Sequence, residues 1–89
     1  MKAVITVLGS DRIGIIAAVT AILAEAGVNI LDISQTIMQE IFTMVMMVDL
    51  APMTTDLETL QHKLGTKGEE LGVQIRVQRD DIFRIMHRI

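Results

Sequence analysis

The stretch Lys-Ala-Val-Ile-Thr-Val-Leu-Gly-Ser-Asp-Arg-Ile-Gly, residues 2–14, decides the fold of this chain. Its first seven residues, 2–8, are rich in β-branched side chains and too few for a typical helix, so they predict a strand. Both faces of that strand are apolar, which is typical of a strand in the middle of a sheet. Gly9-Ser10-Asp11 then breaks the pattern and predicts a loop that supplies the N-cap of a helix.

The segments that follow predict a helix and then a hairpin. Apolar residues recur at helical spacing between Ile15 and Ala26, and Gly27 stands where a helix commonly ends. Residues 28–38 and 41–50 have strand character, and the link between them is only two residues long. Two strands with so short a link predict a β-hairpin.

The second half repeats the helix-then-strand pattern. Thr54-Thr55-Asp56 opens a second helix that ends at Gly72 and directs four leucines inward, namely Leu57, Leu60, Leu64 and Leu71. Gly65 and Gly68 weaken this helix by about 1 kcal/mol each relative to alanine. Residues 73–78 alternate apolar and polar side chains, which predicts a strand with one buried face. Asp80-Asp81 then precedes a short amphipathic segment that carries Ile82, Phe83, Met86 and Ile89.

This order predicts an α+β fold, a ferredoxin-like βαββαβ sandwich. Right-handed crossovers give a four-stranded antiparallel sheet of order 4-1-3-2, with two helices on one face and a short C-terminal helix. We expect a single domain over residues 1–80 and a tail helix over 81–89. The face without helices should carry Val4, Thr6 and Leu8 or their neighbours, and either the row Ile41, Val45 and Met47 or the row Phe42, Met44, Met46 and Val48. Because both rows are apolar, the tail helix or a second subunit must cover that face.

Composition narrows the functional classes. The 89 residues include 8 Lys+Arg against 11 Asp+Glu, a net charge of −3, and no cysteine. Disulfides, thiolate metal sites and cysteine nucleophiles are therefore excluded. The chain has no basic run for nucleic acid and no apolar window long enough to span a membrane, so we expect a cytoplasmic protein. Hydrophobic residues make up 51% of the chain, more than one small core needs, which favours a homodimer or a larger assembly.

Catalytic and metal chemistry lack a recognisable set of residues. His62 and His87 have no third ligand in the pattern, and no nucleophile stands at a suggestive spacing from a base. Acylphosphatases share the βαββαβ order and use an arginine in the first strand–helix loop, but the glycine-rich phosphate cradle expected around Arg12 is missing. We therefore expect no catalytic residue, no metal and no cofactor.

The loop Gly9–Gly14 carries the most information about function. Free backbone N–H groups and the dipole at a helix start favour an anionic group, such as the carboxylate of an amino acid. Asp11 can neutralise an α-ammonium group or simply cap the helix. Asn29, two residues past the Gly27 turn, is either an ordinary turn residue or an amide that both donates to and accepts from an amino acid.

Together these residues resemble the ACT domain family. The resemblance rests on Asp11-Arg12-Ile13-Gly14 at the first strand–helix junction and Gly27-Val28-Asn29-Ile30 at the next, and it spans residues 1 to about 80. Residues 32–36 and 42–44 resemble a subgroup of small stand-alone ACT proteins, which are similar to the ACT units of the glycine-cleavage repressor and of formyltetrahydrofolate deformylase. The resemblance implies a regulatory module whose ligand contacts Asp11 of one subunit and Asn29 of the other. The implied binding residues are Ser10, Asp11, Arg12, Ile13, Gly14 and Asn29, with Ile13 standing where the family commonly has proline.

The first helix supports association independently of that resemblance. Between Ile13 and Ala26 its sole charge is Glu25, and the side away from the core offers Ala17, Ala18, Ala21 and Ala24. Small uncharged residues permit close approach of a second helix, although exposed alanine is also simply favourable in a helix. The sequence thus predicts a non-catalytic ACT regulatory protein that binds a small metabolite, in particular an amino acid, at a homodimer interface. The alternative is a purely structural module that dimerises and docks on a protein partner through the Met-rich sheet face or the tail.

Overall fold

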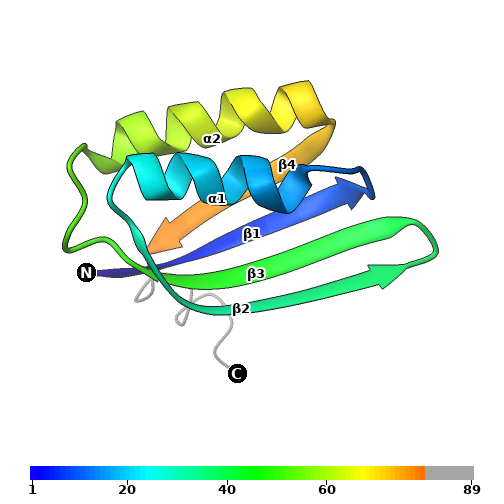
Figure 1. Ribbon diagram of the computed structural model, residues 1–89, viewed down its shortest axis with the longest axis horizontal. Coiled ribbons are helices and arrows are strands. Elements are labelled where there is room, and N and C mark those ends of the chain that lie inside the picture. The colour runs from blue at the N-terminus through cyan, green and yellow to red at the C-terminus, as the bar shows by residue number, and fades with distance from the viewer. Residues whose placement is uncertain (80–89) are drawn as a thin grey trace.

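The computed structural model describes residues 1–79, and these form one antiparallel sheet with two helices on one face (Figure 1). Element bounds are β1 (Lys2–Ser10), α1 (Ile15–Glu25), β2 (Asn29–Met38), β3 (Ile41–Asp49), α2 (Leu57–Leu71) and β4 (Val73–Arg79). The sheet order is β2-β3-β1-β4, so the predicted ferredoxin-like topology is confirmed. The predicted tail helix over 81–89 and the domain boundary at residue 80 lie outside the described residues.

The core lies between the sheet and the helices, and β1 supplies its centre. Ala3, Ile5 and Val7 of β1 are fully buried, because β1 pairs with β3 on one side and β4 on the other. Of the two apolar rows on β3, the helices cover the row that includes Met44 and Met46. The opposite row, Ile41, Val45 and Met47, therefore shares the helix-free face with Val4, Thr6 and Leu8; we call this face the open face.

A bulge in β2 decides which of its side chains face the helices. Ile30 pairs with Val48, but the next pair is Asp32 with Met47, so Leu31 is left without a partner. The extra residue shifts the alternation of the strand by one position. As a result Ile33, Gln35 and Ile37 point toward the helix side of the sheet, where simple alternation from Ile30 would have placed Asp32, Ser34 and Thr36.

The second helix begins and ends as its sequence predicts. The Asp56 carboxylate accepts a hydrogen bond of 2.7 Å from the Thr59 backbone N–H, and Gly72 takes a left-handed conformation at the other end. Of the four predicted inward leucines, Leu60 and Leu64 are fully buried, and Leu57 and Leu71 are partly buried against the core. The helix therefore continues through both of its glycines as far as Leu71.

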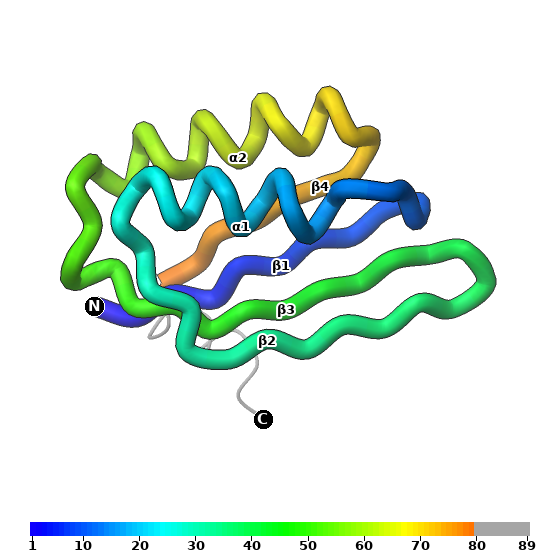
Figure 2. The backbone as a smooth tube through the Cα atoms, in the orientation of Figure 1, coloured from blue at the N-terminus to red at the C-terminus, as the bar shows by residue number. Residues whose placement is uncertain are grey.

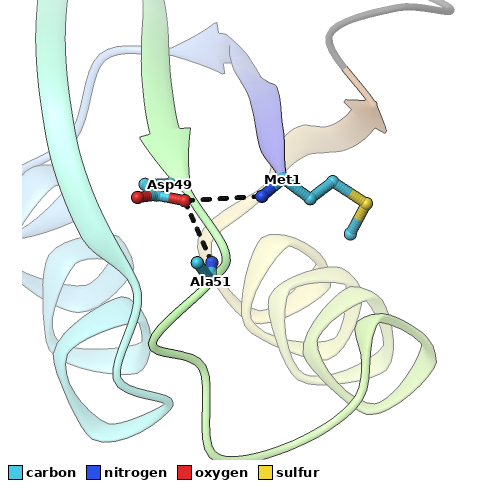
Figure 3. A network of polar contacts seen from close by, with 3 residues as sticks. All are labelled: Met1, Asp49 and Ala51. Carbon is cyan, nitrogen blue, oxygen red and sulfur yellow. Dashed lines mark hydrogen bonds and ion pairs between the residues drawn. The ribbon is translucent and has the colours of Figure 1, made fainter.

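The N-terminus is attached to the end of β3. The Leu50 backbone N–H donates to the Met1 carbonyl at 2.7 Å, and the Met1 ammonium lies 3.7 Å from the Asp49 carboxylate. That carboxylate also accepts from the Ala51 backbone N–H at 3.0 Å (Figure 3). Because the ion pair is exposed, we attribute the attachment mainly to the backbone hydrogen bond.

The two glycines of α2 should respond to alanine with opposite signs. A Cβ on Gly68 would lie 2.8 Å from the Val73 carbonyl oxygen, whereas a Cβ on Gly65 meets no atom within 4 Å. We expect Gly68→Ala to destabilise the fold by about 1–3 kcal/mol through overpacking. Gly65→Ala should stabilise it by up to about 1 kcal/mol through helix propensity. Urea unfolding of both variants measures this, and equal effects would contradict the close approach of α2 to β4.

The cap of α2 should make stability depend on pH. Hydrogen bonds from the side chain and the backbone N–H of Thr59 lower the pKa of Asp56 below its ordinary value. A lowered carboxyl pKa in the folded state means that the stabilisation is present above the ordinary aspartate range and is lost as pH falls through the folded pKa. Asp56→Ala should therefore lower the melting temperature at pH 7 and have a smaller effect at strongly acidic pH. Asp56→Asn, which caps without a charge, is the matched control, and a pH-independent effect of Asp56→Ala would contradict the assignment.

Candidate functional site

A hollow of about 230 Å³ lies between the start of α1 and the end of β2. Its floor is the buried ring of Phe42 on β3. One wall comes from the β1–α1 loop and the first turn of α1, and the other comes from β2. The lining residues are Asp11, Arg12, Gly14, Ile15, Ile16, Ala17, Gln35, Ile37 and Phe42.

The loop beside this hollow is shaped by Gly14. Gly14 occupies the N-cap position with φ +92°, a left-handed conformation that favours glycine, and no side chain caps the helix. The prediction that Gly9-Ser10-Asp11 supplies the N-cap is therefore wrong, because β1 extends to Ser10 and α1 begins only at Ile15. The first helical bond instead runs from the Ala18 N–H to the Gly14 carbonyl at 2.9 Å.

The β2–β3 turn holds the loop in place. The Asp11 backbone N–H donates a 2.8 Å hydrogen bond to the Glu40 carbonyl, which extends the β1–β3 pairing by one residue. Gln39 and Glu40 both have positive φ, 50° and 71°, as a two-residue hairpin of this kind requires. Such conformations are costly for residues other than glycine and are common near functional sites. The site loop is thus fixed by a backbone bond to a strained turn.

Two residues of opposite charge, Asp11 and Arg12, line the hollow. Within residues 1–79, neither Asp11 nor Arg12 takes part in an ion pair or a side-chain hydrogen bond. A Cβ on Gly72 would lie 3.9 Å from Cζ of Arg12, so the guanidinium lies against the carboxyl end of α2, where a cation is favoured. Asp11 and Arg12 therefore bring a carboxylate and a guanidinium to the loop that lines the hollow.

Three of the six predicted binding residues line the hollow, and three lie elsewhere. Asp11, Arg12 and Gly14 line it. Ser10, paired with Ile41, belongs to the row of the open face. Ile13 is fully exposed at the tip of the loop. Asn29 begins β2 at the far end of the sheet, about 26 Å from Ile37 at the usual rise of a strand.

Sequence reasoning did not identify the contribution of β2 to the site. Gln35 and Ile37 pair with Met44 and Phe42, and both line the hollow from the edge of the sheet. Their orientation depends on the bulge at Leu31, which has no glycine or proline to mark it. The positions of the apolar residues, 30, 31, 33 and 37, could have indicated the bulge, because they do not fit one alternating pattern along the whole strand.

Other surfaces of the described residues offer less chemistry. A hollow of about 330 Å³ lies between α1 and α2, and one of about 270 Å³ lies on the open face. Within residues 1–79, no group of three or more His, Asp and Glu side chains is placed to hold a metal ion. The helices in that range are also too short or too polar to cross a membrane.

Comparison with known proteins agrees with the fold. Residues 2–78 match the family model of the ACT domain. A UPF0237 protein of Clostridium acetobutylicum is 53% identical over 89 residues, which cover all of both chains. An ACT domain protein from Streptococcus pneumoniae has a solved structure that superposes with a TM-score of 0.80 at 43% identity, covering 93% of each chain. The chain belongs to the ACT domain family, whose members are generally regulatory, ligand-binding modules.

The predicted likeness to two particular ACT units is also confirmed. A protein assigned as a glycine cleavage system transcriptional repressor is 27% identical, with a TM-score of 0.77, and the match covers 88% of this chain and 44% of that one. A formyltetrahydrofolate deformylase from Pseudomonas syringae has a TM-score of 0.79 at 22% identity, covering 88% of this chain and 27% of that one. At that identity the deformylase shows a shared fold only.

The left-handed Gly14 gives a prediction about the loop. We expect Gly14→Ala to destabilise the fold by about 1–2 kcal/mol, because a side chain disfavours that conformation. No atom lies within 4 Å of a Cβ at this position, so the cost comes from the backbone and not from a clash. Gly14→Asn should cost less, since asparagine tolerates the left-handed region. Chemical denaturation of both variants tests this, and equal costs would argue against the conformational cause.

Proposed function

We propose that this chain is a cytoplasmic, non-catalytic sensor that binds a small amino acid at a homodimer interface. The observation that carries the proposal is the pair of unpartnered opposite charges, Asp11 and Arg12, at one hollow within the described residues. An α-amino acid presents an ammonium group and a carboxylate close together. Asp11 accepts from the ammonium group, and Arg12 donates to the carboxylate.

The size and walls of the hollow support a small ligand. Its volume of about 230 Å³ is below the range of about 300–1,000 Å³ typical of sites for drug-sized molecules. Apolar side chains make most of the wall, including Ile15, Ile16 and Ile37, so an aliphatic ligand side chain is favoured there. The Gln35 amide adds one neutral group that both donates and accepts.

The edge strand β2 supports a dimer in which the site is shared. All ten residues of β2 are exposed or nearly so, and its outer edge has no strand beside it in residues 1–79 (Figure 2). Exposed apolar side chains lie along it at Leu31, Ile33, Ile37 and Met38. A long apolar edge of this kind favours pairing with another strand. A second copy related by a two-fold axis would pair its β2 antiparallel to the first.

Such a dimer would bring the separated Asn29 to the hollow. Antiparallel pairing of two identical strands sets the beginning of each beside the end of the other. Asn29 of the partner subunit would then lie near Ile37 and Asp11. Within a single chain, by contrast, Asn29 and Asp11 lie far apart. The dimer would thus set the beginning of the partner's β2, which carries Asn29, beside each hollow. Ligand binding would stabilise that dimer, because it favours the associated state.

An interaction module without a ligand is the alternative function. The exposed β2 edge favours it, because that edge would drive pairing whether or not the hollow is filled. The sensor requires Asp11 and Asn29 for ligand binding, whereas the interaction module has no ligand for them to bind.

A thermal-shift screen of the common amino acids tests the proposal directly. We expect at least one small aliphatic amino acid to raise the melting temperature of the wild-type dimer, because it binds only the folded state. Asp11→Ala and Asn29→Ala should each abolish that rise, whereas Glu58→Ala on the exposed surface of α2 should keep it. Light scattering of each variant establishes that the dimer is still present.

Mixing the two variants tests whether the site is shared. A heterodimer of Asp11→Ala and Asn29→Ala chains has one site with both residues intact and one with neither. Random exchange makes about half of the dimers mixed, so calorimetry should recover about one quarter of the wild-type binding sites. No recovery in a mixed sample, with exchange verified by mass, would contradict a shared site. A dimer with no response to any amino acid would favour the interaction module.

A further inference from the structure

The two edge strands of the sheet differ in what lies along their outer sides. The sheet ends at β2 on one side and at β4 on the other. Backbone N–H and C=O groups on an outer side can pair with a further strand unless another part of the chain meets them. The contacts of these groups therefore decide at which edge a second strand can be added.

Helix α2 covers the outer edge of β4. The Gln61 side-chain amide donates a hydrogen bond of 3.3 Å to the Val77 carbonyl. A Cβ on Gly68 would lie only 2.8 Å from the carbonyl oxygen of Val73. Val73 and Val77 are four positions apart, so their carbonyls point to the same side of the strand, away from β1. Gln61 and Gly68 are seven positions apart, about two turns, and so share one face of α2. The helix thus occupies two carbonyls that a strand added at β4 would need.

The outer edge of β2 carries the backbone groups of Ile33, Gln35 and Ile37. Met38 and Ile41 flank the two-residue turn and form a hydrogen-bonded pair. Hydrogen-bonded and non-hydrogen-bonded pairs then alternate along an antiparallel ladder. Counting back from Met38, residues 33, 35 and 37 fall at non-hydrogen-bonded positions, so their N–H and C=O groups point away from β3. Within residues 1–79, no strand lies beside them.

One of these outward groups is bound by a neighbouring side chain. The Ile33 N–H donates a hydrogen bond of 2.8 Å to the Asp32 carboxylate. Asp32 is exposed and directly follows the bulge at Leu31. A charged side chain and a bulge are both features that disfavour pairing at a sheet edge. An N–H group has a single proton, so the Asp32 carboxylate and the carbonyl of an added strand compete for it.

We propose that Asp32 limits the pairing of β2 with a second copy of this chain. In the single chain its carboxylate holds the Ile33 N–H, and pairing requires the carboxylate to turn away so that this N–H donates to the partner's backbone. Because β2 pairs with itself, each dimer needs two such releases and brings two carboxylates of like charge onto the paired strands. The inference rests on the proposed β2 pairing and adds the residue that sets its strength.

Three substitutions separate the hydrogen bond from the charge. Asp32→Ala removes both, and we expect the Kd of the dimer to fall about tenfold, because two competing hydrogen bonds are lost. Asp32→Asn keeps an acceptor oxygen without the charge, so its Kd should lie between those of the wild type and Asp32→Ala. Glu58→Ala removes an equal charge from exposed α2 and should leave the Kd unchanged. Sedimentation equilibrium measures all four proteins. If Asp32→Ala dimerises no more tightly than Glu58→Ala, the proposal is overturned, while β2 pairing itself stands.

The backbone amide signal of Ile33 reports the change of acceptor directly. When the wild-type dimer is diluted to monomer, we expect this NMR signal to shift in step with the mass, whereas the signal of buried Ile5 stays constant. A constant Ile33 signal while the mass halves means that the chains associate through another surface, and it overturns the proposal. If the wild type and Asp32→Ala both stay monomeric at millimolar concentration, the proposed β2 pairing fails as well.

Discussion

The site depends on the register between β1 and β3. Nine residue pairs run from Lys2–Asp49 to Ser10–Ile41, and the hydrogen bond from the Asp11 N–H to the Glu40 carbonyl continues that ladder into the loop. A slip by one residue would turn every β1 side chain to the other face of the sheet. Ala3, Ile5 and Val7 would then leave the core, and the loop would lose its attachment to the hairpin turn. Core packing and site geometry are therefore set by the same interaction.

The same constraint explains why the site is open on one side. The register places Phe42 beneath the loop as the floor of the hollow, and it places β2, with Gln35 and Ile37, at the outer edge. Nothing in residues 1–79 lies beyond that edge. The hollow therefore faces the surface on which a second copy would pair. Under the proposed function, a ligand at such a boundary would couple binding to association, because each would complete the other.

Much of the fold could be predicted because its signals are local. The Asp56 cap and the turn glycine Gly72 each have a favoured residue at the required position, and the two-residue link after Met38 is too short for anything but a hairpin. The sequence left open which apolar row of β3 faces the helices, because alternation defines two faces but does not say which one is covered. Only pairing with β1 distinguishes the row of Met44 from the row of Val45.

The site was predicted less completely because it depends on contacts between distant segments. Helix capping depends on neighbouring residues, and on that basis Asp11 was predicted to cap α1. In the structure the Asp11 N–H donates to the carbonyl of Glu40, 29 positions along the chain, and this bond keeps the Asp11 backbone in line with the strands. The bulge at Leu31 is not marked by a glycine or proline, yet it turns Gln35 and Ile37 toward the hollow.

The excess of apolar residues in this small chain lies in two places, the β2 edge and the open face. The first is suited to a second copy, because pairing there extends a sheet that has an unused row of hydrogen-bonding groups. The second offers only side chains, whose burial needs an apolar surface but no strand.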